Sequence, residues 1–96
     1  MNALPVDPIE AMRPWGTPTE KALRRRLHKS WHLSAAGAAR AQSGAARTIL
    51  WIIAQAASDW TFAVHSEEEM KDMADTLVRL FVCANAFERL ERPENG

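Results

Sequence analysis

The chain has few of the residues that indicate secretion, disulfide bonding or membrane insertion. It contains one cysteine, four glycines and no tyrosine among 96 residues. A single cysteine, Cys83, excludes an intramolecular disulfide, which suits a reducing compartment. The longest apolar run, Ile49–Ala54, is far shorter than the roughly 20 residues that a membrane-spanning helix needs, and the first 16 residues do not resemble a signal peptide. We therefore expect a cytoplasmic protein without a membrane partner.

The chain also lacks net charge, since 12 basic residues balance 12 acidic ones. No global charge attracts it to nucleic acid or to an anionic surface. The charges are nevertheless segregated: residues 17–47 hold seven Lys or Arg and one acid, whereas residues 66–96 hold eight acids and four Lys or Arg. Segments of opposite charge can dock on each other within one chain or between chains.

Motifs for catalysis, phosphate binding and metal binding are missing. There is no glycine-rich phosphate loop, and Cys83 lies in the most apolar segment, where burial would make a thiol unreactive. His28 and His32 are four residues apart, a spacing that can hold a metal on a helix, but no acid lies between them. A third ligand would have to come from His65, from Cys83 or from the acids beyond residue 66. We expect neither an enzyme nor a cofactor, and interpret the two histidines as partly exposed neighbours of a packed Trp31.

The local signals that are present predict an all-α chain of three main helices in a single domain over residues 1–96. Residues 1–16 contain Pro5, Pro8 and Pro14 and read as an extended arm. Thr17-Pro18-Thr19-Glu20 combines a capping residue, a first-turn proline and an acid, which is a helix start. Leu23, Leu27 and Trp31 then recur every four residues, with Arg24-Arg25-Arg26 mostly on the opposite, outer side.

The middle of the chain predicts either two helices or one kinked helix over residues 17–63. Residues 34–47 are almost all small, and alanine favours helix, but Gly37 and Gly44 each weaken it and make either position a candidate for a break. Ser66 followed by three glutamates is a second capping signal, and it begins a third helix over residues 66–91. Residues 92–96 form a polar tail.

The apolar surface of these helices exceeds what three helices can cover. The segments Ile49–Trp60 and Leu77–Phe87 are apolar around most of their circumference, so each needs two neighbours. A second copy of the chain in a symmetric homodimer is the simplest cover. The predicted protein-interface residues are Trp51, Ile52, Leu77, Leu80, Phe81, Ala84 and Phe87.

The chain resembles the small all-helical anti-activators of bacterial quorum sensing, the QslA-like family. The resemblance rests on the size, the long helices, the arm "MRPWGTPTE" and the apolar segment "TLVRLFVCANAF". It implies a dimer that binds a LuxR-type transcription factor through apolar helix surface and prevents the dimerisation or the DNA binding of that factor.

Two other functions remain open on the sequence. The segment "KALRRRLHKSWH" predicts a nucleic-acid-binding accessory protein whose phosphate contacts would be Arg24, Arg25, Arg26 and Lys29. A structural subunit of a larger assembly would carry the same apolar excess. We favour the protein-binding regulator, because the rest of the chain is acidic and four tryptophans suit a protein interface.

Overall fold

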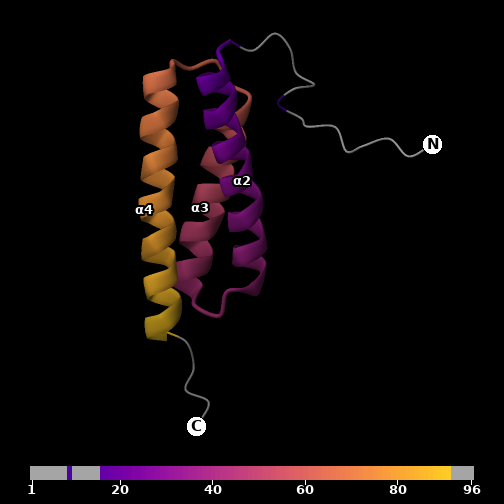
Figure 1. The fold of residues 1–96 in the computed structure, drawn as a ribbon. Coiled ribbons are helices and arrows are strands. Elements are labelled where there is room, and N and C mark those ends of the chain that lie inside the picture. The colour runs from indigo at the N-terminus through magenta and orange to yellow at the C-terminus, as the bar shows by residue number, and fades with distance from the viewer. Residues whose placement is uncertain (1–8, 10–15, 92–96) are drawn as a thin grey trace, which may run out of the picture.

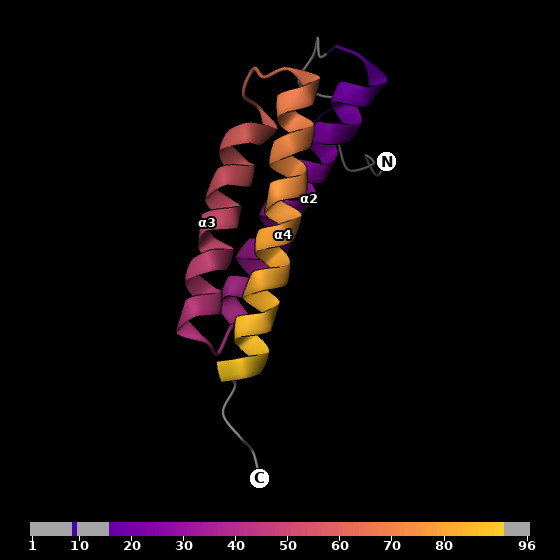
Figure 2. The same ribbon diagram turned by 90° about the vertical axis from the view of Figure 1, so that its left-hand side faces the viewer.

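The described part of the chain is an antiparallel three-helix bundle. The computed structural model describes residue 9 and residues 16–91, and these contain helices α2 (Pro18–Arg40), α3 (Gly44–Thr61) and α4 (Glu67–Glu91) and no strand. Figures 1 and 2 show the three helices running alongside one another in alternating directions. Every helix contacts both of the others. The predicted all-α class with three main helices is confirmed, whereas most of the predicted arm and the tail lie outside the described residues.

Two of the helix starts follow the predicted capping signals. The Thr17 hydroxyl accepts from the Glu20 amide at 3.1 Å and donates to the Glu67 carboxylate, which ties the start of α2 to the start of α4. The Ser66 hydroxyl accepts from the Glu69 amide at 3.1 Å, and the Glu69 carboxylate accepts from the Ser66 amide at 3.0 Å. Both helix starts are therefore set by residues three apart in the sequence.

The reciprocal bonds at Ser66 also affect titration. They hold the pKa of Glu69 below its usual value, with the backbone bond from Ser66 as the largest cause. A depressed carboxyl pKa adds stability above the unfolded-state value, and that contribution is lost as the pH falls through the folded-state value. Because Glu69 is exposed, its effect on the stability of the whole bundle is small.

The small-residue segment is not a continuous helix. Helix α2 runs through Gly37 to Arg40, three residues leave the helical path, and α3 begins at Gly44. The Ser43 hydroxyl accepts from the Ala46 amide at 3.0 Å and so caps α3. The break thus occurs next to Gly44, and Gly37 lies within α2. The reason is that a capping serine directly precedes Gly44, whereas no such residue directly precedes Gly37.

Acids of α4 complete this turn. The Glu88 carboxylate accepts from the amides of Gln42 and Ser43, at 3.1 and 2.9 Å, and Glu91 accepts from the Ser43 hydroxyl at 2.6 Å. Figure 1 shows the C-terminal end of α4 beside the N-terminus of α3. Negative charge at that position also stabilises the helix dipole of α3.

The core between the helices is built largely from alanine. Half of its twelve buried residues are alanines, so the helices approach closely and the core is thin. Larger side chains such as Trp31, Trp60, Leu80 and Phe81 cover its margins and are only partly buried. The buried set is Leu23, Leu27, Ala38, Ala41, Ala46, Leu50, Ile53, Ala57, Met70, Ala74, Leu77 and Ala84.

One polar atom in this interior is unsatisfied. Ser34 on α2 is fully buried, and its hydroxyl has no hydrogen-bond partner among the residues that the structure describes. An unpaired buried hydroxyl retains the cost of leaving water without the gain of a new bond.

We predict that Ser34→Ala stabilises the bundle by about 1 kcal/mol, since it removes the unpaired hydroxyl and introduces the better helix former. Urea unfolding followed by circular dichroism measures the change. Ser58→Ala on α3 is the matched control, because Ser58 is partly exposed and its substitution changes helix propensity alone. Equal gains in the two variants would show that the Ser34 hydroxyl carries no desolvation cost.

Candidate protein-interaction surfaces

Large apolar side chains remain exposed after the three helices have packed. Eight of them in the described part of the chain are exposed by 40% or more. They are Leu33, Trp51, Ile52, Val64, Val78, Val82, Phe87 and Leu90. A single exposed leucine is ordinary on a protein surface, whereas neighbouring ones with an apolar hollow between them indicate a binding surface.

The first surface, which we name the α3 face, is formed by Trp51 and Ile52. They are exposed by 52% and 55%. With Ala56 and the polar residues Thr48, Gln55 and Asp59 they line a shallow hollow of about 510 Å³. An aromatic side chain with a polar surround resembles the centre of a protein–protein interface.

The second surface is an apolar groove between α2 and α4, which we name the α2–α4 groove. It has a volume of about 210 Å³. Leu33 contributes from α2, while Val78 and Val82, one turn apart and both exposed, contribute from α4. The complete lining is Ser30, Leu33, Leu77, Val78, Phe81 and Val82.

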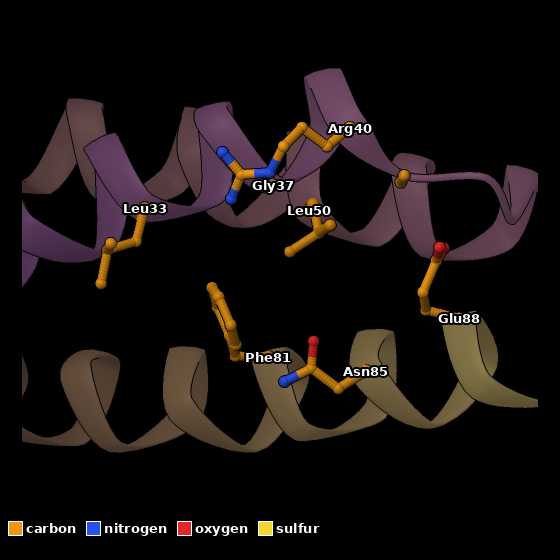
Figure 3. Close-up of a pocket in the computed structure, with 8 residues that line it drawn as sticks. Leu33, Gly37, Arg40, Leu50, Phe81, Asn85 and Glu88 are labelled. Carbon is orange, nitrogen blue, oxygen red and sulfur yellow. The ribbon is translucent and has the colours of Figure 1, made fainter.

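A neighbouring hollow extends this apolar surface toward the turn between α2 and α3. Figure 3 shows Leu33, Leu50 and Phe81 around it, with Arg40 and Asn85 supplying polar groups. Its volume is about 320 Å³, and Leu33 and Phe81 line both this hollow and the α2–α4 groove. The apolar surface is therefore continuous along the line where α2 meets α4.

The structure separates the seven predicted interface residues into three groups. Trp51, Ile52 and Phe87 are exposed, and Leu80 and Phe81 are partly buried against the core. Leu77 and Ala84, exposed by only 2% and 1%, belong to the core and offer almost no surface to a partner.

Three apolar residues of the α2–α4 groove were absent from the predicted interface. Leu33, Val78 and Val82 are exposed there, although Val78 and Val82 lie in the same apolar segment as the predicted residues. The spacing of four between the two valines was the available signal, but the sequence could not say which face of α4 the other helices cover.

The predicted basic surface of α2 is interrupted. The expectation that Arg24 lies on the outer face is wrong: its side chain is 1% exposed. Its guanidinium donates to the carbonyls of Thr61 and Ala63, both at 2.8 Å, and lies 3.3 Å from the Glu20 carboxylate. Arg24 thus caps the C-terminal end of α3 from α2, where a cation also suits the helix dipole.

The other predicted nucleic-acid contacts lie at the surface. Arg25, Arg26 and Lys29 are exposed, and Arg26 forms an ion pair with Asp75 of α4 at 3.3 Å. Lys71 and Arg26 hold the pKa of Asp75 below its usual value, with the Lys71 hydrogen bond as the larger cause. Part of the basic surface is therefore engaged by the acidic helix of the same chain.

Cys83 is exposed, which corrects the expectation that its helix buries it. The reason is that α4 presents only one side to α2 and α3, and Cys83 falls on another side next to Val82. Within residues 9 and 16–91, no three His, Cys, Asp or Glu side chains come together as a metal-binding group. Nor does any helix of that part have the length and apolar character required to cross a membrane.

No protein family, curated protein or solved structure matches this chain.

We predict that Arg24→Met lowers the free energy of unfolding by about 3 kcal/mol. The substitution leaves two carbonyls at the end of α3 unpaired and Glu20 without its cation. Urea unfolding measures the loss, with Lys29→Met as the control because Lys29 is exposed on the same helix. A loss below about 0.5 kcal/mol, the range of an ordinary surface substitution, would contradict the structural role of Arg24.

Proposed function

We propose that this protein is a protein-binding regulator that self-associates and uses its remaining apolar surface to hold a helical segment of another protein. The observation that carries the proposal is the exposure of neighbouring apolar side chains on two separate surfaces, the α3 face and the α2–α4 groove. When another chain covers such a surface, the free energy gained is about 25 cal/mol for each Å² of apolar area removed from water. Two distinct surfaces suit a protein that contacts its own copy and a target.

The α2–α4 groove supports self-association. It lies between two helices, so two copies that meet groove to groove bring four helices together, the arrangement that a four-helix bundle uses to bury apolar side chains. Val78 and Val82 of one chain would then pack beside Leu33 of the other. An interface that repeats the same patch on both chains is the kind that two-fold symmetry requires.

The α3 face supports target binding. Trp51 is the largest aromatic side chain that lines the α3 face or the α2–α4 groove. Tryptophan is enriched among the residues that contribute most of the binding free energy at interfaces. Ile52 beside it widens the apolar contact, and Thr48, Gln55 and Asp59 provide a polar border. An amphipathic helix of a partner is the segment that fits such a surface.

The proposed target is a transcriptional activator of bacterial quorum sensing. The resemblance to quorum-sensing anti-activators, carried by "MRPWGTPTE" and "TLVRLFVCANAF", suggests a LuxR-type activator in the bacterial cytoplasm. Capture of the activator through its helical dimer interface would prevent its dimerisation or its binding to DNA. The discriminating experiment adds purified protein to such an activator on its operator and measures release of the DNA.

We favour this reading over nucleic-acid binding because of the arrangement of the arginines. Arg24 is buried and Arg26 is paired with Asp75, so α2 offers fewer free cations than its sequence suggests. A direct contact with phosphates would give steeply salt-dependent binding to DNA, whereas release of an activator through apolar contacts would tolerate salt.

We predict that the double substitution Val78→Arg/Val82→Arg converts a dimer into a monomer. It introduces charge into the α2–α4 groove, which costs several kcal/mol at a buried interface and raises the dimer dissociation constant by about 100-fold or more. Analytical ultracentrifugation over a concentration series measures this. Val64→Arg is the control, because Val64 is 88% exposed in the connection between α3 and α4 and lines neither surface. Wild-type protein that remains monomeric throughout the series would contradict self-association.

We predict a different effect for Trp51→Ala. The variant remains a dimer and keeps its helical circular dichroism spectrum, since Trp51 is half exposed. Its affinity for the target falls by about 30-fold, which corresponds to the roughly 2 kcal/mol of an interface hot spot. Competition for the activator measures the loss, with Leu90→Ala as the control because Leu90 is exposed at the far end of α4. Undiminished affinity would show that the target binds elsewhere.

A further inference from the structure

Two histidines of α2 bring one ring nitrogen each within contact distance of the other. The Nε2 atoms of His28 and His32 are 3.2 Å apart, and their ring centroids are 4.5 Å apart. His32 is exposed and His28 is half-buried, so the point between the two nitrogens lies at the protein surface. The sequence spacing alone made this geometry possible, but only the side-chain rotamers in the fold bring the two nitrogens together.

The distance between the nitrogens matches a shared metal ligand set. Imidazole nitrogen binds Zn²⁺ at about 2.0–2.1 Å, so two nitrogens on one ion lie about 2.9 Å apart at a right angle and about 3.4 Å apart at the tetrahedral angle. The observed 3.2 Å falls between these values. We propose that His28 and His32 form a two-histidine chelate for a borderline divalent transition-metal ion such as Zn²⁺, Ni²⁺ or Cu²⁺.

Neighbouring rings hold the histidines in place for this chelate. Trp31 stacks on His32, with centroids 4.7 Å apart and planes inclined by 25°. Trp31 and Phe62 both meet His28 edge to face, at centroid distances of 5.6 and 6.5 Å. A ligand pair that is already oriented loses little side-chain freedom when the metal binds.

Binding changes the proton position on one ring and exchanges water ligands of the ion for the two Nε2 atoms. In the metal-free pair one Nε2–H can donate to the other Nε2, which leaves a single lone pair at the meeting point. In the metal-bound pair both rings carry their proton on Nδ1, so both Nε2 lone pairs point to the ion. Each new metal–nitrogen bond replaces a bond from the hydrated ion to a water molecule, and that water is released to the solvent.

The surroundings predict which ions bind. Nitrogen ligands suit Zn²⁺, Ni²⁺ and Cu²⁺, whereas Mg²⁺ and Ca²⁺ need oxygen ligands. Lys29 lies between the two histidines in the sequence and is exposed, so it adds positive charge near the site. The described residues contain no group of three metal-binding side chains, so the protein supplies two ligands here. With two protein ligands, the remaining positions belong to water, and the ion is exchangeable.

Titration of tag-free protein with ZnCl₂, NiCl₂ and CuCl₂ tests the site. Cys83 is exposed and would itself bind these ions, so the parent protein for all measurements carries Cys83→Ser. Isothermal titration calorimetry is expected to show one ion per chain and no heat with MgCl₂. The melting temperature is expected to rise with ZnCl₂ concentration, because the ion binds the folded pair.

Single variants locate the ligands. His32→Ala, and separately His28→Ala, are expected to weaken binding by about tenfold or more and to abolish the metal-dependent rise in melting temperature. His65→Ala is the matched control, because it removes one imidazole whose ring stacks on Trp60, with centroids 3.6 Å apart. Circular dichroism without metal confirms the folding of each variant. If the His28→Ala variant is unfolded, the His32→Ala variant alone tests the site, because His32 is exposed and its substitution leaves the fold intact.

Fluorescence gives an independent measurement. Cu²⁺ bound at the pair lies next to the Trp31 ring and is expected to quench its emission, and Trp31→Phe is expected to remove most of that quenching. The proposal is overturned if His32→Ala binds the ions as tightly as the parent protein, or if His65→Ala loses as much affinity as His32→Ala. Both measurements use the isolated protein, so they are independent of the proposed target.

Discussion

Helix α3 is held at both of its ends by charged side chains from its neighbours. Glu88 and Glu91 of α4 bind the amides and the hydroxyl at its N-terminal side, and Arg24 of α2 binds the carbonyls at its C-terminal side. Each charge has the sign that the helix dipole favours at that end. Helix α3 has no acid in its first turn and no base in its last, so other helices supply the charged end interactions that its own sequence lacks.

These end contacts explain how a thin core can hold the bundle together. Alanines let the helices approach closely, but they bury little apolar area each, so packing alone stabilises the fold modestly. The buried guanidinium and the acids fix the register of α3 against α2 and α4 at two distant points. Each helix also presents only part of its circumference to the other two, so Trp51, Val78 and Val82 on the remaining sides stay exposed.

Several of the exposed apolar residues fall into two groups on the surface of the bundle. Trp51 and Ile52 lie together on α3, while Leu33, Val78 and Val82 lie together along the boundary of α2 and α4. Scattered exposure would indicate nothing beyond an ordinary surface. Grouping on two surfaces supports the proposal of a dimer with a further partner. The histidine pair of α2 adds a candidate point of metal control on the same small scaffold.

The sequence by itself determined the helical class, the three helices and the starts of α2 and α4. Those starts depend on residues three apart, Thr17 with Glu20 and Ser66 with Glu69, and such local bonds can be read from spacing. The tertiary structure alone decided that Arg24 points inward, that Cys83, Val78 and Val82 are exposed, and that Leu77 and Ala84 belong to the core. It also brought Glu88 to the turn before α3. The physical reason is that sequence periodicity shows on how many sides a helix is apolar, but not which of those sides its neighbours cover. The closeness of the packing and the partner of each charged side chain depend on residues that are far away in the chain.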